Sequence, residues 1–328
     1  MTRQRLFGLW LATILFSLVV PAQGQQSTKI PKVGILQSAP VEASTDNLQA
    51  FQAGLRELGY EEGKNIVLLY RHANGDVRQL PALASDLVKV PVDAMVVAGT
   101  QSTLAAREAT STIPIIVGAA GDLVRTGLVK SLARPGGNVT GSTVISPDIG
   151  GKRVALLTEV VPKALRIAVL LYSSSGTDRD EAKQIEAAAQ SRNIKIQMIE
   201  VRDPKDFQKA EDAVKAESAK ALILLQSSFT TSHRKQLAEI GTRNRIPTMC
   251  DSARWAEAGC ALSYGPDLPH QYRRAAVYLD KILKGAKPSH LPVEQPSKFE
   301  FIVNMKTTNQ IGLSLSQSVL YRATRVIR

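Results

Sequence analysis

Short apolar segments alternate with amphipathic segments along most of this chain, and that alternation limits the folds open to it. Between the apolar segments, apolar residues recur at helical spacing, as Leu48, Phe51 and Leu55 do. The segments themselves are apolar throughout, which is typical of parallel strands covered by helices on both faces. Strands are predicted at 32–36, 66–70, 94–98 and 114–118. This succession predicts a doubly wound α/β lobe.

The same rhythm restarts after residue 150 and predicts a second lobe of the same kind. Its strands are expected at 166–171, 195–199, 221–225, 246–249 and 261–264, with helices between them. A long helix at 272–284 and a last strand at 299–303 follow. We therefore predict an α/β fold of two doubly wound, Rossmann-like lobes. In such folds ligands bind at the carboxyl ends of the strands, in the cleft between lobes.

The stretch 132–141 (LARPGGNVTG) lies between the two series. Pro135 cannot continue a helix, and Gly136 and Gly137 tolerate the positive φ values of a sharp exit. We interpret the stretch as a hinge, where a helix that follows Asp122 ends and the chain crosses between lobes. An ordinary helix-to-strand loop inside one sheet is the alternative.

The amino terminus has the pattern of a secretory signal peptide, residues 1–24. Arg3 and Arg5 precede an apolar run at 6–20, and small residues follow it. The run is shorter than the roughly 20 residues that span a bilayer. A lipid anchor needs a cysteine just after the run, and the only cysteines are Cys250 and Cys260. We expect a released, soluble mature chain.

The net charge of +12 at pH 7 raises the possibility of a nucleic-acid partner. Basic residues, however, stand beside acidic ones, as in 179–181 and 209–212, and no run of five like charges occurs. A solvated surface explains the charge better, so no nucleic-acid partner is expected.

Cys250 and Cys260 fall at the end of one predicted strand and the start of the next. In a parallel arrangement this separates them, so we predict that they are not disulfide-bonded.

Polar residues at the predicted strand ends of the first lobe are candidate ligand contacts. The segment 99–103 follows a buried strand and opens a helix, where free N–H groups and hydroxyls favour a carboxylate; a plain helix cap is the alternative. Asp122 either meets a ligand ammonium or caps the next helix. The candidates are Gln37, Ser38, Thr100, Gln101, Ser102, Thr103 and Asp122.

The second lobe supplies matching candidates at its own strand ends. Asp251 and Arg254 either contact the ligand or form an internal cap and salt bridge. Tyr264 either stacks on a ligand or packs in the interior. The candidates are Ser173, Ser174, Gln226, Ser227, Asp251, Arg254 and Tyr264.

Catalytic and metal-binding patterns are weak. The four histidines show no metal-ligand spacing, and there is no nucleophile-elbow or dinucleotide fingerprint. We expect no catalytic residue, no metal and no cofactor.

Four motifs occur in order: 132–141 (LARPGGNVTG), 252–254 with 257–259 (SAR, EAG), 262–265 (LSYG) and 292–300 (PVEQPSKFE). With them the chain resembles the ABC-transporter substrate-binding proteins that include tryptophan- and tyrosine-binding members. The resemblance covers 33–328. It implies a type I periplasmic-binding fold with three crossings between lobes. It places lobe 1 at 29–143 with 266–291, and lobe 2 at 144–265 with 292–328.

The resemblance also implies a function. The protein is expected in the periplasm, as a monomer that captures a small ligand, an amino acid or other carboxylate, and delivers it to an ABC permease with its ATPase subunits. One alternative is a two-lobed racemase-like enzyme, which needs two cysteines facing each other across the cleft. Another is the ligand-sensing domain of a receptor, which needs a membrane or DNA-binding segment.

Overall fold

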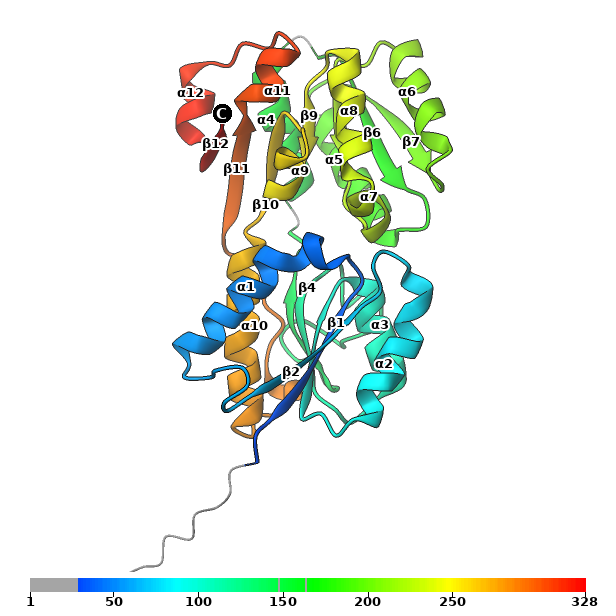
Figure 1. The fold of residues 1–328 in the computed structure, drawn as a ribbon. Coiled ribbons are helices and arrows are strands. Elements are labelled where there is room, and N and C mark those ends of the chain that lie inside the picture. The colour runs from blue at the N-terminus through cyan, green and yellow to red at the C-terminus, as the bar shows by residue number, and fades with distance from the viewer. Residues whose placement is uncertain (1–28, 147, 163) are drawn as a thin grey trace, which may run out of the picture. The chain divides into compact units, whose positions relative to one another are not determined.

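The computed structural model of this chain describes residues 29–328 except Pro147 and Lys163. The predicted signal peptide lies outside the described residues. Two separate sheets form, each with helices on both faces (Figure 1). We call the five-stranded sheet with its helices lobe 1, and the seven-stranded sheet with its helices lobe 2. The two-lobed α/β fold predicted from the sequence is confirmed.

Lobe 1 has the strand order β2-β1-β3-β4-β5, with every pair parallel. Helices α1 and α10 cover one face around Phe51 and Tyr272, and α2 and α3 cover the other around Leu87. Its elements are β1 (Lys32–Gln37), α1 (Val41–Glu57), β2 (Val67–His72), η1 (Val77–Gln79), α2 (Leu80–Lys89), β3 (Ala94–Ala98), α3 (Thr100–Ala109), β4 (Ile115–Ala120), β5 (Val139–Thr143), α10 (Leu268–Leu283) and η2 (Pro288–His290).

Lobe 2 has the order β12-β11-β10-β9-β8-β6-β7, parallel except for the β10–β11 pair. Helices α4 and α5 pack on one face, and α6, α8 and α9 on the other. Its elements are α4 (Ile149–Val160), β6 (Arg166–Tyr172), α5 (Gly176–Gln190), β7 (Lys195–Val201), α6 (Asp206–Ala216), β8 (Ala221–Leu224), α7 (Ser228–Ser232), α8 (Arg234–Asn244), β9 (Thr248–Cys250), α9 (Ala253–Glu257), β10 (Leu262–Pro266), β11 (Phe299–Asn304), α11 (Met305–Gln310), α12 (Gln317–Arg322) and β12 (Arg325–Ile327).

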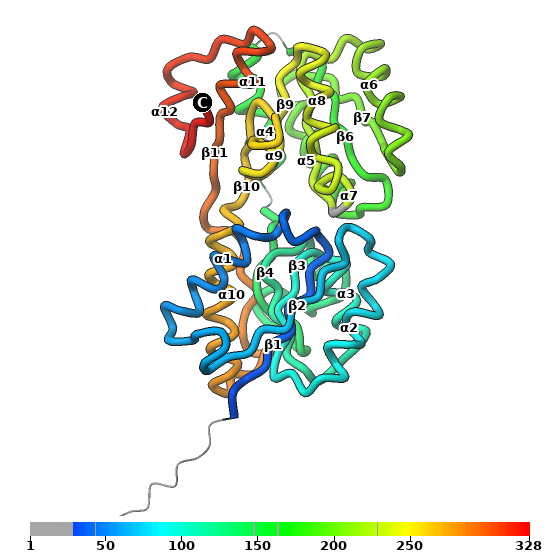
Figure 2. Tube along the Cα trace, viewed as in Figure 1, coloured from blue at the N-terminus to red at the C-terminus, as the bar shows by residue number. Residues whose placement is uncertain are grey.

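The chain passes between the sheets three times. It leaves lobe 1 after β5, returns from β10 into α10, and leaves again on the way to β11, a path that can be followed in Figure 2. Before the last crossing, residues 291–294 run along β5: Thr140 Oγ1 donates to Leu291 O at 2.6 Å, and Thr143 N donates to Glu294 O at 2.9 Å. The residue boundaries predicted for the lobes stay a prediction.

The interpretation of 132–141 as a hinge after a helix is wrong in two respects. Residues 122–134 form turns, the first of which is capped by Asp122. Gly127 takes φ +70°, a conformation in which a right-handed α-helix cannot continue. Val139 and the residues after it form β5, which pairs with β4 inside lobe 1. The stretch is therefore a loop and strand within one sheet, and the crossing follows Thr143.

The prediction for the cysteines is also wrong. Cys250 and Cys260 form a disulfide, with their Cα atoms 6.6 Å apart. The sequence argument placed them at opposite ends of parallel strands. Strand β9 has only three residues, so its two ends are about 7 Å apart at 3.3 Å per residue. The chain after the short helix α9 returns close enough for a bridge.

Gly141, in the 132–141 stretch, has no room for a side chain. It takes φ +123°, and a Cβ atom there would lie 2.2 Å from the carbonyl oxygen of Val117 on β4. We expect Gly141→Ala to lower the free energy of unfolding by about 3 kcal/mol or more, from strain and loss of strand pairing. Gly137→Ala is the control, because a Cβ there meets nothing within 4 Å. Urea unfolding of both variants measures the difference, and equal stabilities would contradict this account of β5.

Candidate ligand-binding site

The amino terminus of α3 in lobe 1 presents unsatisfied hydrogen-bond donors. Its N-cap is Gly99, with φ +86°, and no side chain caps the helix. The N–H groups of the first turn therefore remain open to an outside acceptor. Ser102 is fully buried, and its hydroxyl has no hydrogen-bond partner. This end of the helix is suited to an anionic group.

Gln37 and Tyr272 adjoin this helix end. Gln37 ends β1 beside Ala98 of β3, and its buried Nε2 has no partner. The side chain of Gln37 lies near the hydroxyl of Tyr272, which comes from the first turns of α10, but its Nε2 does not reach hydrogen-bond geometry with it. Burial raises the pKa of Tyr272, while Gln37 and the charge of Arg254 oppose the shift. Tyr272 therefore stays a neutral hydrogen-bonding group.

Three other candidates in lobe 1, Thr100, Thr103 and Asp122, make hydrogen bonds within the lobe. Thr100 Oγ1 accepts a hydrogen bond from Gly121 N at 3.1 Å, and Thr103 Oγ1 donates to Gly99 O at 2.9 Å. Asp122 Oδ1 accepts from Val124 N at 3.0 Å and Arg125 N at 2.9 Å, so it caps a turn, where the sequence had predicted a ligand contact or the cap of a helix. Gln101 is exposed and Ser38 is buried.

In lobe 2 a buried arginine lies among carboxylates. Arg153 on α4 is 1% exposed; its Nε donates to the carbonyl oxygen of Tyr264 at 2.8 Å, and its Nη1 pairs with Glu181 on α5. Glu181 acts electrostatically on both Asp178 and Asp251. Asp178 is buried and accepts from Tyr172 N at 3.0 Å and from the hydroxyl of Ser175 at 2.6 Å. We call Arg153, Asp178, Glu181 and Asp251 the carboxylate cluster.

Asp251, like Glu181, is a partly exposed member of the carboxylate cluster. The amide group of Gln226 lies against its carboxylate, and the amide orientation that satisfies both groups is the one in which the nitrogen donates to Asp251 Oδ1 at 2.6 Å. Burial raises the pKa of Asp251 to about 7; Arg153 opposes this shift and Glu181 adds to it. Burial likewise raises the pKa of Asp178 to about 6. One arginine does not balance three carboxylates, so this cluster favours an additional positive charge.

The remaining candidates of lobe 2 differ in role. Ser173 accepts from Arg202 Nε at 3.1 Å, Ser174 is exposed, and Ser227 caps α7 through a capping box with Thr230. Tyr264 stacks on Phe299, with ring centroids 5.8 Å apart. Tyr264 therefore packs against β11, and its contact with a ligand stays a prediction.

Arg254 does not form the internal salt bridge with Asp251 considered above. It extends from α9 to lobe 1, where it donates to Glu42 O and to Asp46 Oδ2, both at 3.1 Å. Arg125 of lobe 1 makes a second ion pair between lobes, with Asp180 Oδ2 of α5 at 2.6 Å. Thr177 approaches so closely that a Cβ on Gly121 would lie 2.4 Å from its hydroxyl. Side chains of both lobes thus meet around the strand ends.

Aromatic rings also gather at the strand ends of lobe 2. Tyr172, at the end of β6, stacks on Phe229 of α7 with centroids 4.7 Å apart. Phe207 and His233 pack against the same Phe229 ring at 6.0 and 4.8 Å. These partly buried rings supply an apolar surface beside the carboxylate cluster.

Sequence reasoning missed the buried members of the carboxylate cluster, although helical spacing carried a signal for them. Arg153 shares the apolar face of its helix with Leu156, Leu157 and Val160, and Asp178 shares one with Ala182 and Ile185. A charged residue at an apolar position of an amphipathic helix is a candidate for a buried polar role. Tyr272 and Trp255 carried no such signal, because aromatic residues are ordinary in a core.

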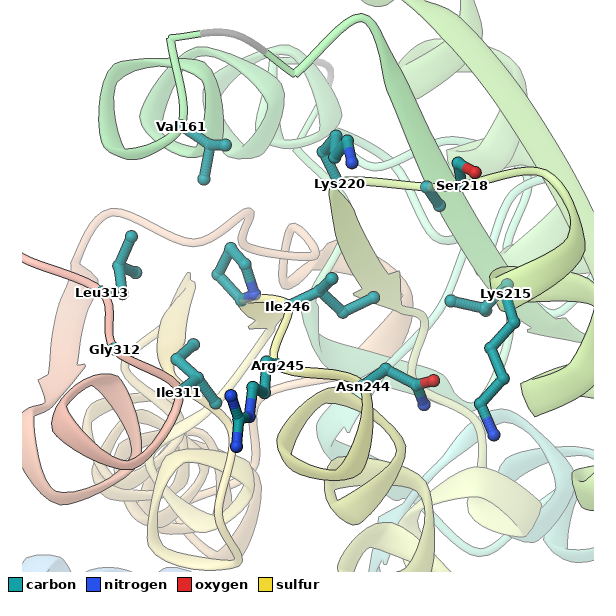
Figure 3. Close-up of a pocket in the computed structure, with 13 residues that line it drawn as sticks. Val161, Lys215, Ser218, Lys220, Asn244, Arg245, Ile246, Ile311, Gly312 and Leu313 are labelled. Atoms are coloured by element: carbon teal, nitrogen blue, oxygen red, sulfur yellow. The ribbon is translucent and has the colours of Figure 1, made fainter.

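A cavity of about 510 Å³ lies elsewhere in lobe 2 (Figure 3). It is lined by the carboxyl-terminal ends of α6 and α8 and by Ile311 and Leu313 after α11, near the residues that precede β8 and β9. This is the amino-terminal edge of the strands, whereas the candidate residues stand at the carboxyl-terminal edge. The cavity is therefore separate from the candidate site.

Among the residues that the structure describes, no cluster of three or more histidine, cysteine or acidic side chains is arranged to hold a metal ion. None of the described helices has the length and apolar character needed to cross a membrane.

Residues 32–327 match the family model described as ABC transporter substrate binding protein. The chain belongs to this family. It is a solute-binding protein with the type I periplasmic-binding fold, and members of the family are typically extracellular or periplasmic.

Similar proteins cover nearly the whole of this substrate-binding protein. A tyrosine-binding protein of Clostridioides difficile (strain R20291) is 26% identical over 288 residues, 88% of this chain and 82% of that protein. A conserved domain protein of Vibrio cholerae O1 biovar El Tor is 28% identical, with a TM-score of 0.85 over 91% of this chain and all of that one. A domain from Streptococcus pneumoniae in complex with L-Trp is 24% identical, with a TM-score of 0.84 over 90% and 99%.

The raised pKa of Asp251 predicts a pH dependence of the ligand-free protein. The native state binds this proton more tightly than the unfolded chain, whose aspartates titrate near pH 3.9. The free energy of unfolding should therefore fall as the pH rises from about 4 to about 7, with Asp178 contributing below about pH 6. We expect Asp251→Asn to flatten the decline between pH 6 and pH 7 in urea unfolding. A wild-type curve that rises across this range would contradict the assignment.

Proposed function

We propose that this protein binds a free amino acid, or a close analogue with a carboxylate and an amino group, between its lobes. The α3 end of lobe 1 would bind the carboxylate, and the Asp251 side of lobe 2 would bind the amino group. The observation that carries the proposal is the pairing of unsatisfied donors in one lobe with excess carboxylates in the other.

For the carboxylate end, the supporting groups are the open N–H groups of α3 and the unpartnered donors of Ser102 and Gln37. A buried donor without a partner costs roughly 1 to 3 kcal/mol, which a ligand oxygen would recover. Charge-assisted hydrogen bonds contribute roughly 1.5 to 3 kcal/mol each. Two or three of them approach the roughly 8 kcal/mol of a micromolar complex.

For the amino end, the support is the charge of the carboxylate cluster. An ammonium group beside Asp251 would return that carboxylate to its ionised form and balance the second of the three negative charges. Gln226, already against Asp251, would keep the carboxylate oriented. Affinity for such a ligand should accordingly increase as the pH rises toward neutrality.

For the ligand side chain, the rings of Tyr172 and Phe229 favour an apolar or aromatic group. The names of two similar proteins, one tyrosine-binding and one in complex with L-Trp, agree with this preference. We propose L-tyrosine and L-tryptophan as the first ligands to test.

We further propose that the protein acts in the periplasm after removal of residues 1–24, as a monomer that delivers its ligand to an ABC permease and its ATPase subunits. The role is binding without catalysis. The racemase-like alternative needs two free thiols facing each other, and both cysteines of this chain are bonded to each other. The family match supports the transport role.

A ligand screen tests the function directly. Amino acids and small carboxylates are added one at a time at 1 mM, thermal unfolding is recorded, and each mixture is assayed for chemical change. A ligand present at about 100 times its dissociation constant stabilises the native state by about 2.7 kcal/mol. We expect a raised melting temperature with unchanged ligand. Turnover of the ligand, or no shift with any amino acid, would contradict the proposal.

Ser102→Ala tests the carboxylate position. Its hydroxyl has no partner within the protein, so we expect ligand-free stability to be equal to or higher than that of wild type. Affinity should fall by about fivefold to tenfold, or about 1 kcal/mol. Thr100→Ala is a poorer choice, because it also removes the acceptor of Gly121 N.

Thr103→Val is the matched control, because the Thr103 hydroxyl already bonds to Gly99 O in the same helical turn. Its affinity should equal that of wild type in calorimetry. Equal affinity for Ser102→Ala as well would remove α3 from the site.

A further inference from the structure

We propose that the Cys250–Cys260 disulfide positions the ligand-binding residues of lobe 2, by holding the segment 251–259 in the form that reaches lobe 1. This inference rests on the proposed ligand-binding function. It assigns the cysteines a role in affinity, beyond a general contribution to stability.

The disulfide encloses two of the candidate residues of lobe 2, one of which, Arg254, contacts lobe 1. Asp251 directly follows the first cysteine, and Arg254 lies between the two, on α9. Both cysteines are fully buried, in the core cluster that also contains Trp255. The bridge therefore fixes both ends of the segment to the interior of lobe 2.

Helix α9 cannot hold this position by its own helical structure. It has five residues, and no side chain caps it at Ser252. Isolated helices of that length are not stable in water, so α9 depends on its attachments. Besides the disulfide, these are the buried Trp255 ring and a hydrogen bond from Asn304 Nδ2 to Ala256 O at 2.7 Å.

The contact that α9 makes with lobe 1 needs such pre-organisation. Arg254 is 15% exposed, but its partner Asp46 is 64% exposed on α1. Pairs with an exposed partner contribute little when their side chains must be ordered on contact. Fixing the backbone under Arg254 in advance reduces that ordering cost, so the bridge strengthens the contact without touching it.

The residues around Asp251 are equally sensitive to a shift of this segment. The carbonyl of Asp251 approaches Gly265 so closely that a Cβ there would lie 1.6 Å from the oxygen. Asp251 thus sits against the strand β10 that leads into the crossing to lobe 1. Releasing Cys250, its neighbour in the chain, would let this close contact open and move the carboxylate.

The test compares four exported proteins: wild type, Arg254→Ala, Cys250→Ala with Cys260→Ala, and the triple variant. Each is titrated with L-tyrosine and L-tryptophan by calorimetry. We expect Arg254→Ala and the double cysteine variant each to bind about fivefold more weakly than wild type. Because loss of the disulfide already removes the Arg254 contact, the triple variant should bind as the double cysteine variant does, about fivefold more weakly than wild type. The product of independent effects, about 25-fold, would overturn the inference.

Trp255 gives a readout that does not depend on ligand, because it is the only tryptophan in residues 29–328 and is 1% exposed. In the cysteine-free protein its emission should shift to longer wavelength and acrylamide quenching should increase. Val214→Ala is the control: it weakens the same core cluster from α6 and should leave both emission and affinity unchanged.

The outcomes separate the two proposals. If wild type binds neither amino acid, the proposed function fails for these ligands and the inference falls with it. If wild type binds and the cysteine-free protein binds equally well, only the inference is overturned. If Arg254→Ala, which keeps the disulfide, binds as wild type does, the contact of Arg254 with lobe 1 does not contribute to affinity and the inference is again overturned. This result decides the matter even if the cysteine-free protein does not fold.

Discussion

Parallel strand pairing is the constraint on which the position of the site depends. A parallel strand must be followed by a crossover, here a helix or a long loop, before the next strand can begin. All strands of lobe 1 therefore end at one edge of their sheet, and β6 to β10 of lobe 2 end at one edge of theirs. Gln37, the α3 terminus and the turn after β4 share such an edge in lobe 1. Asp251, Gln226 and Tyr172 share one in lobe 2. The contacts of Arg254 and Arg125 bring these two edges together.

The two edges differ in electrostatic character, and this follows from which chemical groups each lobe exposes. Lobe 1 contributes neutral donors: helix N–H groups, an amide and hydroxyls. Lobe 2 contributes carboxylates around Arg153. Burial of Asp178 and Asp251 raises the pKa values of these two carboxylates. A zwitterion matches this asymmetry, because it carries one charge suited to each edge. A neutral sugar or a simple anion would leave the carboxylates of lobe 2 unbalanced.

The sequence predicted the fold well because apolar periodicity is a local signal that tertiary structure rarely overrides. Strand 94–98 was predicted with the bounds that the structure has, and the candidates Gln37, Ser102 and Asp251 lie at strand or helix ends as expected. The helix after Asp122 was wrong because Leu128, Val129 and Leu132 fit helical spacing although Gly127 bends the chain. The partners of Arg254 could not be predicted, since 208 residues separate it from Asp46.

The disulfide shows where topological reasoning needs element lengths as well as element order. In neighbouring parallel strands, a residue at the end of one strand and a residue at the start of the next lie at opposite edges of the sheet. The distance between them is then about the length of a strand. That separation shrinks to about 7 Å when the strand has three residues, and a five-residue helix cannot carry the chain far from it. The same shortness leaves α9 without stability of its own. A segment that must present Arg254 to another lobe, and that has so little internal structure, depends on covalent attachment more than any longer helix in this fold does.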